Sequence, residues 1–227
     1  MPTETPVSLA QMQQHIAAVQ VSRTINEVIV HHTWSPTSAD YKGISTVRAV
    51  REYHMQVRGW SDNGYHIMVA PNADLYLCRP LAREGAHTAG RNAHSIGISF
   101  IANFDVERPE QYGGMQAGIR VIAMLLKRWG LTTSAIRFHR EFADKTCPGT
   151  NMSLTKTREW VHEVLTNGGC VVGDPRIIVL PDSTVVECSA RVENGITRAD
   201  LRPLVEALGY GVYEHIRDQG KVYLRPR

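Results

Sequence analysis

The sequence predicts an α/β domain over about residues 8–166, followed by a small α+β module. Short apolar runs rich in β-branched residues alternate with stretches whose apolar residues recur at helical spacing, which is typical of strands alternating with helices. Glycine- and proline-containing breaks then interrupt this pattern, so we expect a first domain over 1–166, a linker over 167–175 and a second unit over 176–227. A composition of 43% apolar and 21% charged residues fits packed cores.

The elements of the first domain follow from apolar spacing and from residues that start or stop helices. Helices are expected where a serine can cap an amphipathic stretch or a glycine can end one: 9–19 after Ser8, 45–58 with Ser45 as cap and Gly59 as stop, 115–129 before Gly130, and 153–165 from Ser153. The buried face of the second helix is predicted to be Val47, Val50, His54 and Val57. Strands are expected at 27–32, 65–70, 75–78, 95–104 and 136–138.

The second unit is predicted to combine strands with one helix. Strands are expected at 177–180, 185–190, 211–215 and 221–224. Thr197 and Asp200 form a capping-box pattern, which predicts a helix whose apolar face is Leu201, Leu204, Val205 and Leu208. This module carries no cluster of metal ligands or nucleophiles, so its residues alone leave its role open.

Charge and cysteine content exclude several classes of protein. The net charge of +3 is scattered along the chain, unlike the dense basic stripe of a nucleic-acid binder. No segment approaches the roughly 18 apolar residues of a membrane span, and residues 1–20 do not have the pattern of a secretory signal. The four cysteines form no disulfide framework. Cys78 is expected to be a small buried hydrophobe; Cys170 and Cys188 could pair with each other, but we expect two isolated thiols.

Two segments predict a metal site. The strand at 27–32 ends in His31 and His32, and a later segment places Cys147 eight residues after His139. Side chains alternate along a strand, so at most one of the two adjacent histidines reaches a given site. Two imidazoles and one thiolate suit zinc, and three protein ligands leave a fourth position open, as in catalytic zinc sites. Lys145 adds a cation beside the predicted metal.

Five segments occur in an order that resembles a known family: Val30–Trp34, Gly59–His66, Gly85–Asn92, Ser95–Ile98 and His139–Pro148. They are similar to the zinc-dependent type 2 N-acetylmuramoyl-L-alanine amidases, the family that includes phage T7 lysozyme and the peptidoglycan recognition proteins. The resemblance covers roughly residues 25–150. It implies a central mixed β-sheet flanked by helices, with a groove for the glycan and stem peptide of bacterial peptidoglycan. Because lytic enzymes often carry a wall-binding module, the resemblance implies such a role for the second unit, and a structural or oligomerising role stays open beside it.

The resemblance also implies roles for individual residues. The metal ligands would be His31, His139 and Cys147, with Zn²⁺ as the cofactor. Tyr65 occupies the position of the family's catalytic tyrosine, and Lys145 matches the lysine of the T7-like, catalytically competent branch.

Further residues are predicted to contact substrate. His87 and Asn92 flank a glycine-rich loop at 85–90 that would border the groove, and Thr88 and Arg91 are further candidates there. For Trp34, an apolar platform in the groove and a core position are both open.

The implied activity is hydrolysis of the amide between N-acetylmuramate and L-alanine. Zinc lowers the pKa of water to about 7 and polarises a carbonyl, which suits a reaction between a poor electrophile and a poor nucleophile. Lys145 would stabilise the negative charge that develops on the carbonyl oxygen, and Tyr65 would orient the water or carry its proton.

Other readings of the resemblance are a peptidoglycan-binding module without turnover and a cytosolic amidase that recycles wall fragments. A phage or prophage endolysin is the expected origin. Lacking a signal peptide, such an enzyme would accumulate in the cytoplasm of the producing cell and reach the wall through a holin lesion.

Overall fold

The computed structural model describes residue 4, residues 6–166 and the strand segments 177–179, 185–187, 190–193, 196–199, 210–216 and 221–226. The chain divides into two compact units, Met1–Gly169 and Cys170–Arg227, and each is considered by itself. The predicted linker at 167–175 lies outside the described residues, as do Cys170 and Cys188, so the domain boundaries stay a prediction. No helix in the described parts of the chain is long and apolar enough to cross a membrane.

The first unit is built on a six-stranded sheet in the order β1-β4-β3-β5-β2-β6. Strand β2 runs parallel to β5 and β6, and β3 runs parallel to β5, whereas β4 is antiparallel to both β1 and β3. The mixed sheet predicted from the resemblance is therefore confirmed. The strands are β1 (Pro6–Val7), β2 (Glu27–His32), β3 (Ile67–Val69), β4 (Leu75–Leu77), β5 (Ser95–Phe100) and β6 (Ile136–Phe138).

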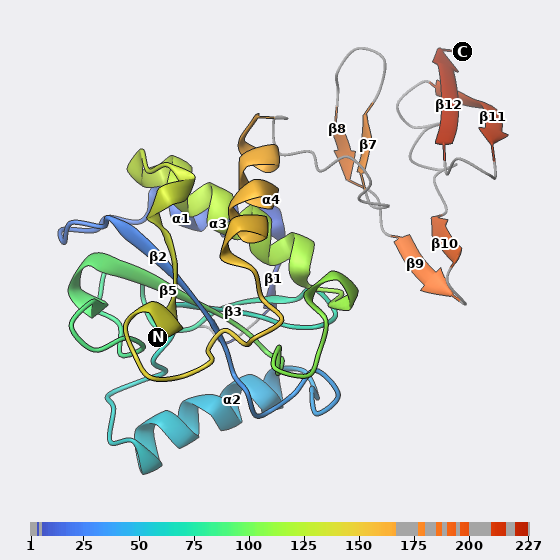
Figure 1. Cartoon of the computed structure of the whole chain (residues 1–227). Helices are drawn as coiled ribbons and strands as arrows, with labels where there is room; N and C mark the ends of the chain where they lie inside the picture. The colour runs from blue at the N-terminus through green and yellow to red at the C-terminus, as the bar shows by residue number, and fades with distance from the viewer. Residues whose placement is uncertain are drawn as a thin grey trace. The chain divides into compact units, whose positions relative to one another are not determined.

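Helices cover both faces of this sheet (Figure 1). One face carries α1 (Leu9–Ala18), α3 (Met115–Trp129) and α4 (Leu154–Thr166), and the other carries α2 (Ile44–Glu52). All residues of the central strands β2 and β5 are buried, as expected for strands covered on both sides. The side chains of β3 divide between the two layers, because Met68 packs with α2 whereas Val69 faces Gly118 of α3.

Several predicted helix ends are confirmed. Ser8 caps α1 with a complete capping box, Gly130 ends α3 in the left-handed conformation, and the Ser153 hydroxyl accepts a hydrogen bond from Lys156 N at the start of α4. The predicted strand at 95–104 is shorter, because β5 ends at Phe100. Ile101 N still donates to Val69 O of β3, but Ala102 N donates to the Thr33 hydroxyl instead of to a strand carbonyl.

The predicted start and face of α2 need correction. Gly43 is the cap, while Ser45 lies inside the first turn and donates its hydroxyl proton to Lys42 O. Residues Tyr53–Val57 continue α2 as a π-helical turn. The wider turn changes the phase of the helix, so Val57 leaves the predicted buried face and is 67% exposed.

In the described segments of the second unit, the strands form three antiparallel pairs. They are β7 (Ile177–Val179) with β8 (Val185–Glu187), β9 (Ala190–Glu193) with β10 (Ile196–Ala199), and β11 (Tyr210–Ile216) with β12 (Lys221–Pro226). The β9/β10 hairpin was not predicted. It places Thr197 inside a strand, so the prediction that Thr197 caps a helix is wrong; the predicted helical face at 201–208 lies outside the described residues.

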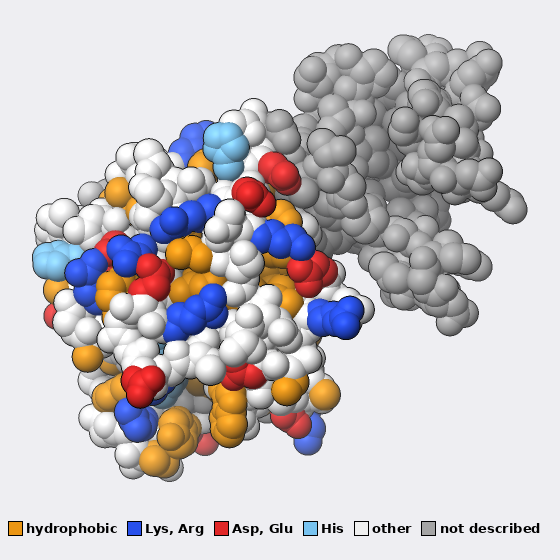
Figure 2. Space-filling view, viewed as in Figure 1, with side chains coloured by type: hydrophobic (Ala, Val, Ile, Leu, Met, Phe, Trp, Pro, Cys, Tyr) orange, Lys and Arg blue, Asp and Glu red, His pale blue; other side chains and the backbone are white. Residues whose placement is uncertain are grey.

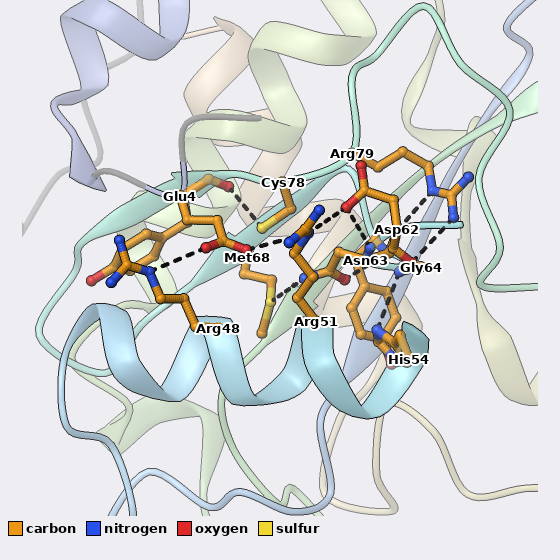
Figure 3. Close-up of polar contacts among 12 residues, drawn as sticks. Glu4, Arg48, Arg51, His54, Asp62, Asn63, Gly64, Met68, Cys78 and Arg79 are labelled. Atoms are coloured by element: carbon orange, nitrogen blue, oxygen red, sulfur yellow. Dashed lines mark hydrogen bonds and ion pairs between the residues drawn. The ribbon is translucent and has the colours of Figure 1, made fainter. Parts of the chain in front are cut away.

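A buried arginine holds the loop that leads into Tyr65 (Figure 3). The Arg79 guanidinium is 6% exposed and donates hydrogen bonds to the carbonyl oxygens of Asn63 (2.6 Å), Glu84 (3.0 Å) and Asp62 (3.3 Å). Carbonyls in a tight loop cannot pair with one another, and one guanidinium carries five donors in a fixed geometry. Arg79 therefore fixes the path of the chain before Tyr65.

The same loop is tied to α2 and to the helical turn that follows it. The Asp62 carboxylate accepts from Arg51 Nε at 2.7 Å, and Gly64 N donates to His54 Nδ1 at 3.2 Å. Glu4 forms further ion pairs with Arg51 and with Arg48 (Figure 3).

We expect Arg79→Met to lower the free energy of unfolding by about 3 kcal/mol, because the two carbonyls of this loop and the carbonyl of Glu84 lose their donor at about 1 kcal/mol each. Urea denaturation at neutral pH measures this change. Arg83→Met is the matched control: Arg83 is 52% exposed, its side chain donates to the Ser61 hydroxyl, and its loss should change stability by less than about 0.5 kcal/mol. Equal effects of the two substitutions would contradict the clamping role of Arg79.

His66 is a fully buried histidine between two loops. Its Nδ1 accepts a hydrogen bond from Gly97 N at 2.9 Å, so the ring proton lies on Nε2, which donates to Arg83 O at 3.0 Å. Burial lowers the pKa of His66 to about 3. In the unfolded chain the imidazole titrates near 6.5, so below that pH the unfolded state binds a proton that the folded state does not.

The contribution of His66 to the free energy of unfolding should therefore be constant above about pH 6.5. It should decrease as the pH falls from 6.5 to about 3. The contribution of His66 to this loss is about 2 kcal/mol at pH 5. In His66→Gln, the difference between the unfolding free energies at pH 7 and pH 5 should shrink by that amount. The exposed His162, changed to Gln, should leave the difference unaltered. An unaltered difference in His66→Gln would show that the buried ring is not the group that titrates.

Candidate metal centre

Strand register places the two predicted histidine ligands side by side. Strands β2 and β6 are parallel, with Val30 opposite Phe138. The next residue of each chain segment is His31 and His139, so both lie level with one another at the carboxyl ends of adjacent strands, where open α/β sheets bind their ligands. Their ring centroids are 4.6 Å apart. As strand alternation predicts, His32 faces elsewhere, and its Nδ1 accepts from Phe104 N at 3.1 Å.

Cys147 reaches the same point from the loop after β6. Its Sγ lies 3.5 Å from His31 Nδ1. Arg140 holds this loop: its backbone N donates to Cys147 O at 2.8 Å, and its guanidinium donates to Gly149 O and Met152 O, both at 2.7 Å. The loop is held again from the other side by Asp105.

The Asp105 carboxylate accepts two hydrogen bonds from the residues that flank Cys147. One comes from the Thr146 hydroxyl and one from Thr150 N, both at 2.8 Å. These bonds lower the pKa of Asp105, although its partial burial acts in the opposite direction. The position of the sulfur is thus set by the surrounding loop rather than by its own rotamer alone.

One ligand atom each of His31, His139 and Cys147 lie within 4.8 Å of one another. Ligands bound to one zinc ion at about 2.0–2.3 Å in tetrahedral geometry are roughly 3.5 Å apart, so small side-chain shifts would let all three reach a single ion. Two nitrogens and one sulfur are also the donor types that zinc accepts. The residues therefore fit zinc both by chemistry and by spacing.

Burial keeps these three groups uncharged while no cation is near. It lowers the pKa of His31 well below the usual range. It also lowers the pKa of His139 to about 4, with a smaller contribution from the nearby charge of Lys145. It raises the pKa of the Cys147 thiol to about 12. Neutral imidazoles are ready to bind a metal, and a divalent cation would supply the positive charge that a thiolate needs.

The cluster lies beside a cleft of about 1220 Å³. His139 lines this cleft together with six of the residues predicted to act on or contact substrate: Trp34, Tyr65, His87, Thr88, Asn92 and Lys145. Arg91, a further candidate, is not one of the lining residues. The lining residues come from several segments far apart in the sequence, so only the folded chain brings them together. Their roles stay predictions, but the structure places them around one space.

Tyr65 and Lys145 are the two predicted catalytic residues. The Tyr65 ring lies 5.1 Å from the His31 ring, centroid to centroid, and burial raises the pKa of its phenol. Lys145 is exposed, two residues before Cys147, and its charge contributes to the lowered pKa of His139. A phenol and a lysine side chain can both donate hydrogen bonds, and both residues line the cleft.

His87 and Asn92 are held in place by hydrogen bonds with other residues of the chain. His87 is 7% exposed, and its Nδ1 lies 3.1 Å from His31 Nε2. The Asn92 side-chain oxygen accepts from His87 N at 2.9 Å and from Thr88 N at 2.8 Å. Arg91, a further candidate, pairs with Glu27.

An arginine also holds the loop of His87 and Asn92. The Arg23 guanidinium donates to the carbonyl oxygens of Asn92 (3.3 Å), Ala93 (3.2 Å) and Ser95 (2.9 Å).

Trp34 is 61% exposed, which excludes the core position that the sequence left open.

Sequence reasoning missed two basic residues of the cleft, Lys42 and Arg58. Each stands alone in the sequence without a motif, so no pattern could single it out. With Lys145 they give the lining three lysine or arginine side chains against one carboxylate, that of Asp40. On the face seen in Figure 2, basic side chains are dispersed among acidic and uncharged ones, as expected from the scattered charge of the sequence.

Known proteins resemble this chain over the region that contains the cluster and the cleft. Peptidoglycan-recognition protein SC1a of Drosophila melanogaster is 30% identical over 148 residues, which span 63% of this chain and 78% of the relative. The human N-acetylmuramoyl-L-alanine amidase is 27% identical over 142 residues, or 59% of this chain and 24% of the relative.

A solved structure, the endolysin N-acetylmuramoyl-L-alanine amidase LysCS from Clostridium intestinale, is 25% identical with a TM-score of 0.51. The match covers 64% of this chain and 90% of that one. Residues 21–150, more than half of the chain, match the family described as N-acetylmuramoyl-L-alanine amidase. The segment includes the His-His-Cys cluster and every cleft residue named above, and the chain belongs to this amidase family.

Proposed function

We propose that this protein is a zinc-dependent hydrolase that cleaves the amide bond between N-acetylmuramate and L-alanine in bacterial peptidoglycan. The observation that carries the proposal is the cluster of His31, His139 and Cys147 beside a cleft that Tyr65 and Lys145 also line. Family membership supports an action on peptidoglycan. Relatives include both a named amidase and named recognition proteins, so turnover is the property to test.

The two imidazoles and the thiolate would hold the ion and leave one position free. Bound zinc supplies a Lewis acid, which polarises the scissile carbonyl and makes water more acidic. The Lys145 ammonium stabilises negative charge that develops on the carbonyl oxygen. Because burial raises the pKa of Tyr65, its phenol keeps its proton at neutral pH and can donate a hydrogen bond to the reacting groups.

The cleft suits a ligand with both apolar and anionic parts. Trp34 offers an exposed aromatic face, which can pack against a sugar ring or an aliphatic side chain. Lys42 and Arg58 line the same cleft and can pair with carboxylates of the stem peptide. His87 and Asn92 border it.

Digestion of purified peptidoglycan tests the activity. We expect release of alanine α-amino groups without new reducing sugar ends, and loss of this release when a chelator removes the metal. Zinc bound at one ion per chain with no release from several wall chemotypes would favour a recognition protein instead. New reducing ends would mean that a glycosidic bond is cut.

The same assay tests Lys145. Lys145→Met should lower kcat by about 10²–10³-fold, the usual effect of removing one group that stabilises a developing oxyanion, while zinc content stays unchanged. The matched control is Lys156→Met, because Lys156 lies outside the cleft lining and pairs with Glu110 on the surface. A Lys145 variant with normal kcat would remove this residue from the proposed mechanism.

We also propose that the protein acts as an endolysin of a phage or prophage, made in the cytoplasm of the producing cell and released onto its wall. The similarity to an endolysin structure supports this origin. Expression in a susceptible bacterium should leave the culture intact without a holin and lyse it when a holin is co-expressed. Lysis at the same rate without a holin would argue against release through a membrane lesion.

A further inference from the structure

Behind the predicted ligand His31 stands a second buried histidine. His31 is 1% exposed and His87 7% exposed. The two nitrogens of His31 face different partners: Nδ1 lies 3.5 Å from Cys147 Sγ, and Nε2 lies 3.1 Å from His87 Nδ1. A histidine that binds a metal through one nitrogen needs a partner for the N–H of the other, and that partner fixes the tautomer and the ring orientation.

The contacts around His87 indicate which of the two histidines donates the hydrogen bond between them. Thr88 Oγ1 lies 3.1 Å from His87 Nδ1 and 3.4 Å from His31 Nε2, so His87 Nδ1, at 3.1 Å, is the nearer of the two possible acceptors for His31 Nε2. On the other side, His87 Nε2 lies 3.4 Å from Ser95 Oγ, which itself donates to Arg91 O at 2.8 Å. Because the Ser95 hydroxyl donates its proton to Arg91 O, its oxygen can only accept a hydrogen bond from His87. His87 therefore carries its proton on Nε2 and offers the Nδ1 lone pair to His31.

The backbone around His87 is shaped to keep the ring in this place. A Cβ added at Gly85 would lie 2.4 Å from His87 Cδ2, and one added at Gly97 of β5 would also lie 2.4 Å from that atom. Neither position can carry a side chain while the ring stays where it is, so the two glycines form a slot for it. Asn92 fixes the loop by accepting from His87 N.

We propose that His87 is a positioning residue for the metal site: its Nδ1 accepts the Nε2 proton of His31 and thereby presents His31 Nδ1 to the metal. The proposal rests on the zinc site of the proposed function. It differs from the substrate contact predicted for His87, because a positioning role acts on metal affinity when no substrate is present.

Two substitutions of His87 separate the hydrogen bond from the bulk of the ring. In His87→Asn, the side-chain oxygen lies near the place of Nδ1 and can still accept the proton of His31. In His87→Leu, a side chain of similar reach has no acceptor. We expect zinc affinity, measured by competition with a chromophoric chelator, to fall about 10–100-fold in His87→Leu and to stay within about threefold of wild type in His87→Asn.

A spectroscopic readout tests the geometry independently of affinity. Co²⁺ in place of zinc should give the same ligand-field absorption bands in wild type and His87→Asn, and shifted bands in His87→Leu because the His31 ring is no longer held. His94→Leu is the control, since His94 is exposed at the end of the same loop; its affinity and spectrum should match wild type. Thermal unfolding of the metal-free variants shows whether each is folded.

If His87→Leu does not fold, Ser95→Ala replaces it. This change removes the acceptor of the His87 Nε2 proton and should lower zinc affinity about two- to fivefold. Wild-type affinity and spectrum in a folded His87→Leu, together with a raised KM for peptidoglycan, would overturn the proposal in favour of a substrate contact. Failure of the wild-type protein to bind zinc would instead overturn the proposed function.

Discussion

The parallel register between β2 and β6 is the constraint on which the site depends. Pairing of Val30 with Phe138 is what makes His31 and His139 neighbours, although 107 residues of sequence lie between them. A slip of one residue would turn every side chain of β2 to the opposite face and exchange His31 for His32. The side chains of β2 are buried on both faces of the sheet. The native register places His32 where its Nδ1 accepts a hydrogen bond from Phe104 N, and a slip would bury a histidine without this partner.

Arginine side chains that donate to backbone carbonyls support the three loops around the site. Arg79 donates to carbonyls of the loop before Tyr65, Arg140 to those after Cys147, and Arg23 to those beside Asn92. Each guanidinium satisfies several carbonyls that no strand or helix can pair, which gives an irregular loop a fixed shape. The chemistry of the cleft is thus placed on loops, and its precision comes from buried or half-buried cations behind them.

Sequence reasoning was accurate where a local signal decides the outcome and failed where a neighbour decides it. The strand at 27–32, the helix at 115–129 and the cap at Ser8 follow from apolar spacing and capping chemistry, and all three are confirmed. Ser45 has the chemistry of a cap, yet Gly43 takes that position. Thr197 likewise lies in a strand paired with β9 despite its capping-box pattern, because pairing across a hairpin overrides local preference.

The sequence by itself determined the alternation of elements, the family motifs and the candidate ligands His139 and Cys147, because a strand end and a Cys-Pro-Gly turn are visible without a fold. The family resemblance selected His31 over His32. Only the tertiary structure decided which ring nitrogen of His31 faces Cys147, that His87 stands behind that ring, and that Lys42 and Arg58 join the cleft. These facts depend on distances between segments far apart in the chain. Hydrophobic periodicity and motif spacing carry no information about such distances until the sheet order is fixed.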